Sequence, residues 1–399
     1  MSYHYPPTAK VGGKRWMHLA NEFIKLGNKL DVIAPETVFI TDTDKSLDIP
    51  ARVHRVQVLL HSISSTRNNA FRTFIGKIWH NCFKIIDRQE GWILPAVMRA
   101  FSVIEDRDIQ LVVASGPPFS TFAAAAVVSL IADLPLVLEY RDPWSNNPGR
   151  SFPRLTGRFM ARVMEKIILS RADAAVFCTD RMKSDFSKSF NNSISGDRSV
   201  TITNGFSRTS TGKSSEKINS IEKNILYAGK FYGGRSINMI ASAAQKYSMT
   251  GNPISITIAG PALLESERAL FNELAPDVKL NELGWLDYGD VRIAMKCADV
   301  LFLPSGKDHA YAIPYKFFDY LQARVPIHAI TPPESAVTDI MKEIDCGEFA
   351  SVDNPQEIER ALFRILNGEG TYSWNGQENF HWDVIGLKYF EFLKSILNG

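Results

Sequence analysis

The chain has 399 residues, of which 45% are hydrophobic and 22% charged, and its formal net charge is +2. This length exceeds what one compact core usually holds, so two α/β domains of ordinary size are expected. The composition is that of a soluble globular protein, and the small net charge gives no general attraction to nucleic acid. The four cysteines stand far apart, without a CxxC pair or a histidine at ligand spacing. They argue against a zinc site and for reduced thiols in a cytoplasmic protein.

The N-terminal segment is polar and lacks the apolar core of a signal peptide. The longest apolar stretch, residues 122–140, is interrupted by Asp133 and Pro135. It therefore predicts a buried helix that leads into a buried strand, and not a membrane span. The chain opens as loop, helix and strand, although a strand should precede the first helix. Only "MSYHY" stands there, so either the first strand is very short or upstream residues are missing.

Short apolar runs alternate with helical patterns along the whole chain. The predicted strands lie at 29–35, 53–59, 111–115, 136–140, 174–179, 200–203, 224–229, 254–260, 278–284, 299–305, 326–331 and 348–351. Apolar strands separated by helices predict parallel sheets covered on both faces.

The polar, Ser- and Lys-rich segment 206–223 predicts a linker between two Rossmann-like domains. The first domain would cover residues 1–205 and the second residues 224–377. A final helix in 378–399 is expected to pack back on the first domain. A cleft is expected where the carboxyl ends of both sheets meet.

Two glycine-rich turns are candidate anion sites. Gly12 and Gly13 precede a helix, whose N-terminal N–H groups would then approach an anion closely, although a plain turn explains the pair equally well. In the second half, Lys230 and Arg235 stand on a loop that starts at Gly229 and leads from a strand to a helix. Two fixed cations on such a loop suit a diphosphate, and the alternative is a solvated loop with incidental charges.

The segment 313–327, "IPYKFFDYLQARVPI", predicts a helix with two distinct faces. Lys316 and Asp319 lie about 60° apart on one face, and Phe317 and Leu321 mark a core-facing stripe. Pro314 suits the first turn. The alternative to a binding role is a solvated Lys/Asp pair on an amphipathic helix.

Charged residues also stand at the end of the predicted strand 136–140 and directly after it. Glu139, Arg141 and Asp142 stand at its carboxyl end, where charges are costly to bury unless they face a cleft. A structural Arg–Asp pair is the alternative. In the second half, Gly284 and Trp285 follow another strand and would present backbone groups to a base.

Two basic features suggest contact with anionic lipid headgroups. Between residues 51 and 104 there are eight Lys or Arg residues against two acids, and bases interleave with large apolar residues in 67–99. Further on, basic side chains recur every fourth residue at Arg150, Arg154, Arg158, Arg162 and Lys166. Such a face would bind a membrane surface, or it is merely a solvated basic face.

The ordered segments resemble a known family. "YPPTAKVGGKRW", "LVVASGPPFSTF", "LPLVLEYRDPW", "TITNGF", "ILYAGKF", "ITIAGP", "ADVLFLPS" and "AIPYKFFDYLQARVPI" are similar to segments of the family-four glycosyltransferases. The resemblance spans nearly the whole chain and is closest to the bacterial branch that builds O-antigen, capsule or exopolysaccharide. It implies the GT-B fold, in which two Rossmann-like domains face each other across a cleft.

The resemblance also implies roles for several residues. Asp319 would hold the ribose of the nucleotide donor, and Lys316 would face the sugar and phosphates. Lys230 and Arg235 match the basic pair that neutralises the diphosphate, in swapped order. Gly12 and Gly13 match the glycine loop near the donor phosphate and the acceptor. The remaining candidates on the donor side are Gly229, Trp285 and Pro314.

The chain departs from the family at two positions. Tyr311 stands where the first of two paired glutamates is usual, and Ser115 and Gly116 stand where a histidine is common. The role of stabilising the sugar is then unassigned, and Glu139 and Asp142 are the substitute candidates.

The resemblance therefore implies a retaining glycosyltransferase of hexosyltransferase type. It would move a sugar from a nucleotide diphosphate, with UDP-sugar the expected donor, to a lipid-linked glycan acceptor at the cytoplasmic membrane face. No cofactor and no metal are expected, because cations of the protein would stabilise the departing diphosphate. A non-catalytic nucleotide-sugar-binding protein and a sugar-nucleotide 2-epimerase of the same fold are the alternatives.

Overall fold

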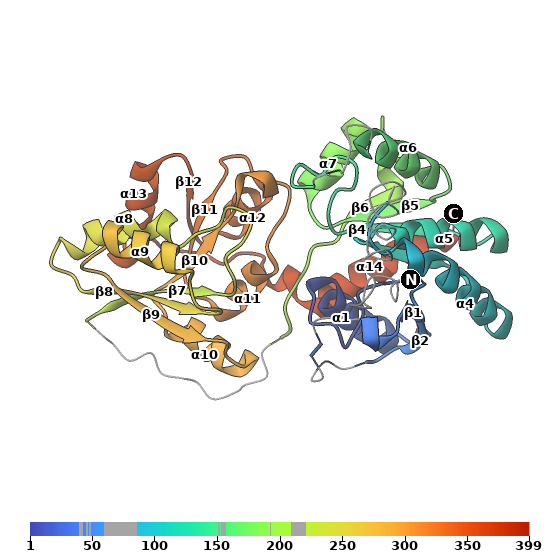
Figure 1. Cartoon of the computed structure of the whole chain (residues 1–399), viewed down its shortest axis with the longest axis horizontal. Coiled ribbons are helices and arrows are strands. Elements are labelled where there is room, and N and C mark those ends of the chain that lie inside the picture. Colours follow the sequence, from blue (N-terminus) through green and yellow to red (C-terminus); the bar gives the residue numbers. More distant parts are fainter. Residues whose placement is uncertain are drawn as a thin grey trace, which may run out of the picture. The chain divides into compact units, whose positions relative to one another are not determined.

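The structure of the chain is a computed structural model, shown in Figure 1. It describes residues 1–39, 43–44, 47, 49–59, 86–150, 152, 157–191, 193–208 and 221–398. The chain divides into two compact units. Unit 1 consists of Met1–Asn204 together with the segment that begins at Trp382, and unit 2 consists of Gly205–His381. Each unit is described by itself.

Unit 1 contains two parallel sheets. Its described strands are β1 (Asp31–Pro35), β2 (Arg52–Val56), β3 (Val112–Gly116), β4 (Leu136–Tyr140), β5 (Ala174–Phe177) and β6 (Ser199–Thr201). β1 pairs with β2, and β3 to β6 pair in chain order. The four residues of β5 and all five of β4 are buried, which fits a sheet covered on both faces.

The first two residues of the chain join these two sheets. The Ser2 N–H donates to the Ile33 carbonyl of β1 at 3.1 Å, and Ser2 forms a parallel bridge with Ser115 of β3. The Ser115 N–H donates to the Met1 carbonyl, also at 3.1 Å. Residues 1–2 thus occupy the place where the opening strand is expected. The strand order reverses here, because β1 and β2 lie on one side and β3 to β6 on the other.

The described helices of unit 1 form two groups. They are α1 (Val11–Lys25), α4 (Ile93–Asp106), α5 (Ser120–Ala132), α6 (Gly157–Leu169), α7 (Asp180–Ser189) and α14 (Trp382–Asn398). α4 packs against α5, which also contacts α6. α1 packs against α14, and Figure 1 shows these helices side by side, one blue and one red. Gly386 of α14 allows this approach, because a Cβ there would lie 2.5 Å from Glu22 Cβ.

Unit 2 contains one six-stranded parallel sheet in the order β12-β11-β10-β7-β8-β9. The strands are β7 (Lys223–Ala228), β8 (Ile254–Ala259), β9 (Lys279–Gly284), β10 (Val300–Pro304), β11 (Ile327–Thr331) and β12 (Gly347–Ser351). From the central β7 the chain adds β8 and β9 on one side, then crosses to add β10, β11 and β12 on the other. This is the doubly wound order, and its reversal lies between β7 and β10.

Two hydrophobic cores cover the two faces of this sheet. Ile225 and Tyr227 of β7 belong to one core, and Leu226 between them belongs to the other, because successive strand residues point to opposite faces. Helices α8 (Asn238–Ser248), α9 (Glu265–Leu274) and α13 (Pro355–Leu366) contribute to the first core. Helices α10 (Tyr288–Cys297), α11 (Tyr315–Ala323) and α12 (Ala336–Ile344) contribute to the second.

The predicted α/β fold with two Rossmann-like halves is confirmed, and each predicted strand is present with ends shifted by a few residues at most. One expectation needs correction, and two fall mostly outside the described residues. The helix predicted within 122–140 is α5, but it is not wholly buried, because Leu130 and Ile131 are 68% and 65% exposed. Most of the predicted linker, 209–220, lies outside the described residues, as does most of 67–99. In the part of the chain that is described, no helix has both the length and the hydropathy to span a bilayer.

Candidate functional site

The candidate site of unit 2 lies at the reversal point of its sheet. In doubly wound sheets, the loops that follow the two strands at this point diverge and leave a crevice beyond their carboxyl ends. Here these loops run from Gly229 to Ser236 after β7 and from Ser305 to Pro314 after β10. The first is shaped by Gly229, Gly233 and Gly234, whose φ angles of +118°, +60° and +76° suit only glycine without strain.

Arg235 ends the first loop and is buried, with 7% of its surface exposed. Its guanidinium carbon lies 4.4 Å from the centroid of the Tyr232 ring. Its Nε and Nη1 are buried and have no hydrogen-bond partner among the described residues. A buried charge without hydrogen bonds is costly, so these two donors are a strong indication of a missing acceptor.

Lys316 follows the second loop, in the first turn of α11. Its Nζ is buried without a hydrogen-bond partner in the described chain and lies 3.8 Å from the centroid of the Tyr227 ring. Gly229 leaves room for it, because a Cβ there would be 3.0 Å from Nζ. Burial, and then the charge of Arg235, lower the pKa of Lys316 to about 7. The two cations therefore repel each other across one small region.

His309 is a third member of this region that the sequence pattern did not reveal. Its ring lies against the first loop, because a Cβ on Gly233 would be 3.3 Å from the ring carbon Cε1. The Nδ1 atom is buried and has no hydrogen-bond partner among the described residues. Burial and the neighbouring Arg235 lower the pKa of His309, so its ring is neutral at pH 7.

Lys230 differs from Arg235 although both stand on the same loop. It is an exposed residue, and the contact that fixes it is a hydrogen bond from the Tyr227 hydroxyl to its backbone carbonyl at 2.8 Å. The structure therefore brings Arg235 together with Lys316 and His309 in a cluster that contains several buried nitrogens, and leaves Lys230 at the surface.

α11 has the two faces expected from its sequence. Phe317 and Leu321 are fully buried in the core. Pro314 is the N-cap residue, and its carbonyl accepts a hydrogen bond from the Phe317 N–H at 2.9 Å. On the other face, Asp319 Oδ1 accepts a hydrogen bond from the Tyr288 hydroxyl at 3.2 Å. Burial and the Asp319 carboxylate raise the pKa of Tyr288, so it remains a donor.

Two further candidates stand at the carboxyl end of β9. Gly284 ends this strand with a φ of +70°. Trp285 follows it with 75% of its surface exposed. Tyr288, which bonds Asp319, begins α10 only three residues later. The hydrogen bond from Tyr288 therefore joins the Asp319 carboxylate of α11 to the start of α10, shortly after the exposed Trp285.

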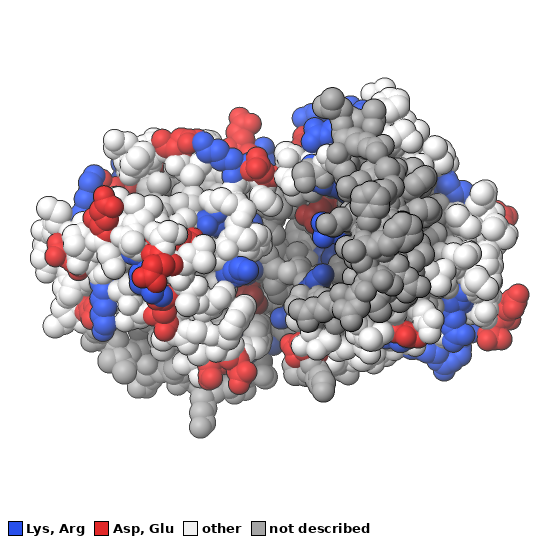
Figure 2. All heavy atoms as spheres, in the orientation of Figure 1, with Lys and Arg blue, Asp and Glu red and all other residues white. Residues whose placement is uncertain are grey.

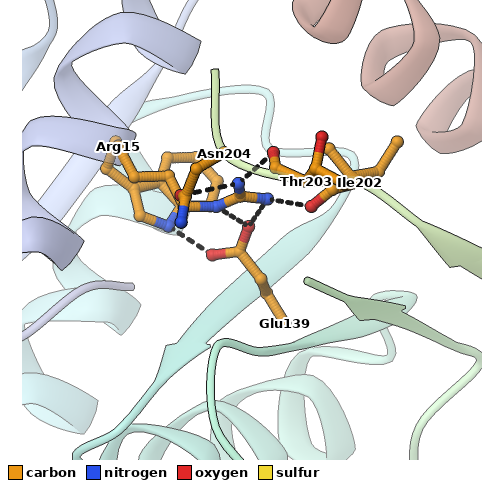
Figure 3. Close-up of polar contacts among 6 residues, drawn as sticks. Arg15, Glu139, Ile202, Thr203 and Asn204 are labelled. Atoms are coloured by element: carbon orange, nitrogen blue, oxygen red, sulfur yellow. Dashed lines mark hydrogen bonds and ion pairs between the residues drawn. The ribbon is translucent and has the colours of Figure 1, made fainter. Parts of the chain in front are cut away.

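In unit 1, Glu139 is the centre of a buried ionic network, drawn in Figure 3. The Arg15 Nε donates to Glu139 Oε1 at 2.9 Å, and the Trp16 indole donates to Oε2 at 2.6 Å. Arg15 and Glu139 both have 0% exposure. Arg15 also donates to the carbonyls of Ile202 and Thr203 and to the Asn204 side chain. The network fastens α1 to β4 and to the segment after β6, and both carboxylate oxygens of Glu139 accept hydrogen bonds within it.

The other candidates of unit 1 lie near this network. Gly12 and Gly13 are in the first turn of α1, where the side chain of Arg141 lies against Gly12 and that of Thr8 against Gly13. Asp142 is half-buried and acts electrostatically on Arg141. Gly13 is therefore required by close packing at the helix start, whereas a Cβ on Gly12 would meet only the end of the flexible Arg141 side chain.

The residues of the predicted basic stripe have different environments in the structure. Arg162 donates to Asn146 and to the Ser189 carbonyl, and Arg150 donates to the Ile86 carbonyl, so both have structural contacts. Arg158 and Lys166 are exposed on α6. Arg154 lies outside the described residues. On the face of unit 2 drawn in Figure 2, acidic and basic side chains are intermingled.

No family model and no curated protein sequence matches the chain. Its structure is similar to a glycosyltransferase from Rickettsia africae ESF-5, at 13% identity over 98% of this chain and 97% of that chain, with a TM-score of 0.63. It is also similar to the apo form of the lipopolysaccharide outer core galactosyltransferase WaaB, at 12% identity over 99% and 98%, with a TM-score of 0.64. Anabaena HepE in complex with UDP-glucose matches at 13% identity over 98% of each chain, with a TM-score of 0.60. Identities this low show the fold alone, and that fold is GT-B.

Proposed function

We propose that the chain is a glycosyltransferase that takes its sugar from a nucleotide diphosphate bound by unit 2. The observation that supports this most is the cluster of Arg235 and Lys316 at the reversal point of the sheet. Their buried nitrogens have no hydrogen-bond partner in the described chain. Two cations held close together without acceptors are suited to a small, doubly charged anion, and a diphosphate has this charge and size.

The same cluster suits the chemistry of glycosyl transfer. When the bond between the anomeric carbon and the diphosphate oxygen breaks, its electrons go to the leaving diphosphate. Arg235 and Lys316 would stabilise this growing charge, and His309 would add a neutral hydrogen bond. The acceptor hydroxyl oxygen forms the new bond to the anomeric carbon, and its proton goes to the oxygen of the leaving diphosphate. Protein cations, and not a metal ion, are the proposed counter-charge.

Neighbouring residues suit the rest of a nucleotide. Asp319 would accept hydrogen bonds from the ribose hydroxyls, and its contact with Tyr288 would orient it. Gly284 and Trp285 would contact the base. UDP-sugar is the proposed donor, and the UDP-glucose complex of HepE supports this choice by similarity of fold.

The finer parts of the proposal concern the acceptor and the stereochemistry. We assign the chain to retaining transfer onto a lipid-linked glycan in surface-polysaccharide synthesis, with peripheral contact to the inner face of an anionic membrane. The resemblance in sequence and the fold similarity to WaaB support this assignment. Since both oxygens of Glu139 are occupied, Asp142 remains the acidic candidate near the carboxyl end of β4.

One observation favours a second candidate, a non-catalytic nucleotide-sugar-binding protein. Tyr311, where the family usually has a glutamate, is 8% exposed and offers no carboxylate. A binding protein would hold the donor without turnover, and a 2-epimerase would convert the donor without an acceptor.

A thermal-shift panel of nucleotide sugars tests the proposal. A true donor at about 100 times its Kd should stabilise the protein by roughly 2.7 kcal/mol, and Arg235→Gln should abolish this shift. If no nucleoside diphosphate shifts the melting temperature, the donor site is wrong. Product analysis of the donor with and without acceptor glycans then separates transfer, epimerisation and binding alone.

A further inference from the structure

The amino group of Lys316 has surroundings that do not suit a permanent positive charge. Its Nζ atom is buried and has no hydrogen-bond partner among the described residues. It lies 3.8 Å from the centroid of the Tyr227 ring, and a Cβ on Gly229 would be 3.0 Å away, so ring and backbone both pack closely against it. A charge that is removed from water without acceptors is costly, so such a lysine favours its neutral amine.

Two charged groups act on Lys316, and their effects oppose each other. The buried guanidinium of Arg235 disfavours a second positive charge, whereas the Asp319 carboxylate, three residues later on α11, favours it. Burial has the largest effect, and the combined result lowers the pKa of Lys316 from 10.5 to about 7. Arg235 stays charged, because a guanidinium does not lose its proton in proteins. Near neutral pH the cluster therefore combines one permanent cation with one lysine that exchanges a proton with solvent.

The other titratable groups packed around Lys316 keep one charge state above pH 7. Burial raises the pKa of Tyr227 and that of Tyr320, and each hydroxyl donates to a backbone carbonyl. Burial, and then the charge of Arg235, lower the pKa of His309, so its ring is neutral there. Among the described groups of this region, Lys316 is therefore the one whose charge changes between pH 7 and pH 8.5.

A diphosphate at the reversal point would remove both reasons for the neutral amine. Its oxygens would accept hydrogen bonds from Nζ and from the unpartnered nitrogens of Arg235, and its negative charge would offset the repulsion between the two side chains. An anion that favours the charged form of a lysine must, in turn, bind more tightly when that lysine is charged, because the coupling is reciprocal.

We infer that binding of the nucleotide diphosphate is coupled to the uptake of a proton by Lys316. The neutral amine of the empty site takes this proton from solvent, and the resulting ammonium donates to the diphosphate oxygens. The identity of the anion rests on the proposed function. The coupling is a separate property of the same site, because an anion could bind without it. The consequence is a donor affinity that falls as the pH rises above 7.

Calorimetric titration of the full chain with UDP tests the coupling. In two buffers of different ionisation enthalpy, the difference in observed heat gives the number of protons taken up. A lysine with a pKa of about 7 that becomes fully charged on binding should take up about half a proton at pH 7 and nearly one at pH 8.5. The Kd for UDP should rise roughly tenfold or more over the same interval. A phosphate group, with a second pKa of about 6, is largely ionised throughout and contributes little.

Three variants assign the proton to its group. Lys316→Met should remove the proton uptake and make the remaining UDP affinity independent of pH from 7 to 8.5. Lys316→Arg carries a charge that does not titrate, and it should bind UDP without proton uptake if the methionine variant binds too weakly to measure. Lys230→Met is the matched control, because Lys230 is exposed, and it should keep the proton uptake.

The neighbouring imidazole is the alternative proton acceptor. His309→Gln should keep both the proton uptake and the pH dependence of the Kd. Proton uptake that persists in the Lys316 variants and disappears in His309→Gln would overturn the inference.

The native protein alone separates the inference from the proposed function. UDP binding with equal Kd at pH 7 and pH 8.5 and without proton uptake would refute the coupling and leave the proposed function intact. Absence of UDP binding at both pH values would instead refute the donor site itself, and the coupling with it.

Discussion

The ammonium nitrogen of Lys316 lies 3.8 Å from the centroid of the Tyr227 ring, in a region where the positive charge of Arg235 repels it. The ring face attracts a cation, but it does not replace the hydrogen bonds that the ammonium loses on burial. Lys316 therefore reduces the stability of the empty protein, and this is the arrangement expected of a residue whose partner is a ligand.

Lys316→Met should accordingly raise the melting temperature at pH 7 and lower the affinity for UDP about tenfold or more. Burial lowers the pKa of Lys316 from 10.5 to about 7. Between these two pH values, the unfolded chain keeps a proton on this lysine that the folded chain has lost. The native protein gains stability from this group as pH rises through that window. The advantage of the methionine variant should therefore shrink from pH 7 to pH 10.5, as measured by thermal melts at several pH values.

Lys230→Met is the matched control, because Lys230 is exposed. It should leave the melting temperature unchanged and the UDP affinity within a few-fold. A destabilised Lys316→Met protein with normal UDP binding would show that the lysine has a structural role.

Arg235→Ala should lower turnover and not merely raise the KM for the donor. A charged hydrogen bond contributes roughly 1.5–3 kcal/mol, which corresponds to about a ten- to 150-fold loss of rate. Lys230→Ala should cost less, since its side chain lies at the surface. Steady-state kinetics with the true donor and acceptor give both values. Parent-like kinetics for Arg235→Ala would remove this residue from the mechanism.

The architecture of this chain could be predicted from its sequence because the strands are short, apolar and separated by helices. β4, for example, is a fully apolar run apart from Glu139, and all five of its residues are buried. The two faces of α11 likewise follow from helical spacing alone, since Phe317 and Leu321 are both buried.

The burial and the interaction partners of the site residues could not be predicted from the sequence. Lys230 and Arg235 look equivalent in the sequence, but a turn with left-handed φ at Gly233 and Gly234 separates an exposed lysine from a buried arginine. Glu139 looks like a carboxylate at a cleft, but its partner Arg15 lies 124 positions away. Local patterns do not contain such long-range pairings.

Glu139→Gln tests the structural role of this carboxylate. It keeps the shape of the side chain but leaves the buried Arg15 without its counter-charge. Breaking a buried pair in this way costs about 3–5 kcal/mol, which should appear as a lower urea midpoint with an unchanged slope. Asp142→Asn, at a half-buried position, should cost much less. A stable Glu139→Gln protein without turnover would instead indicate a catalytic carboxylate.

His328 should make the protein sensitive to acid. It is fully buried in β11, and neither ring nitrogen has a hydrogen-bond partner in the described chain. Burial lowers the pKa of His328 to about 3. As pH falls from 6.5 toward 3, the unfolded chain protonates first, so stability falls by up to about 1.4 kcal/mol per pH unit from this residue. Urea titrations of His328→Leu between pH 6.5 and 4 should show a shallower fall than the parent. Equal slopes would contradict this.

A surface on α5 and α6 should bind anionic membranes. Phe159 and Ile167 of α6 are 66% and 58% exposed, and the exposed bases Arg158 and Lys166 stand beside them in the sequence. α5 contacts α6 and adds the exposed Leu130 and Ile131. Apolar side chains would enter the headgroup region, and each base near an anionic surface contributes about 1 kcal/mol, screened by salt.

The basic and the apolar side chains of this surface should contribute separately to membrane binding, which is measured by cosedimentation with vesicles. Arg158→Gln with Lys166→Gln should remove most of the preference for anionic over neutral vesicles. Phe159→Ser with Ile167→Ser should lower binding to both. Ile221→Ser is the control, because Ile221 is 87% exposed but belongs to unit 2. Equal sedimentation of the native protein with neutral and anionic vesicles, or binding that does not weaken with salt, would exclude this surface as an electrostatic membrane contact.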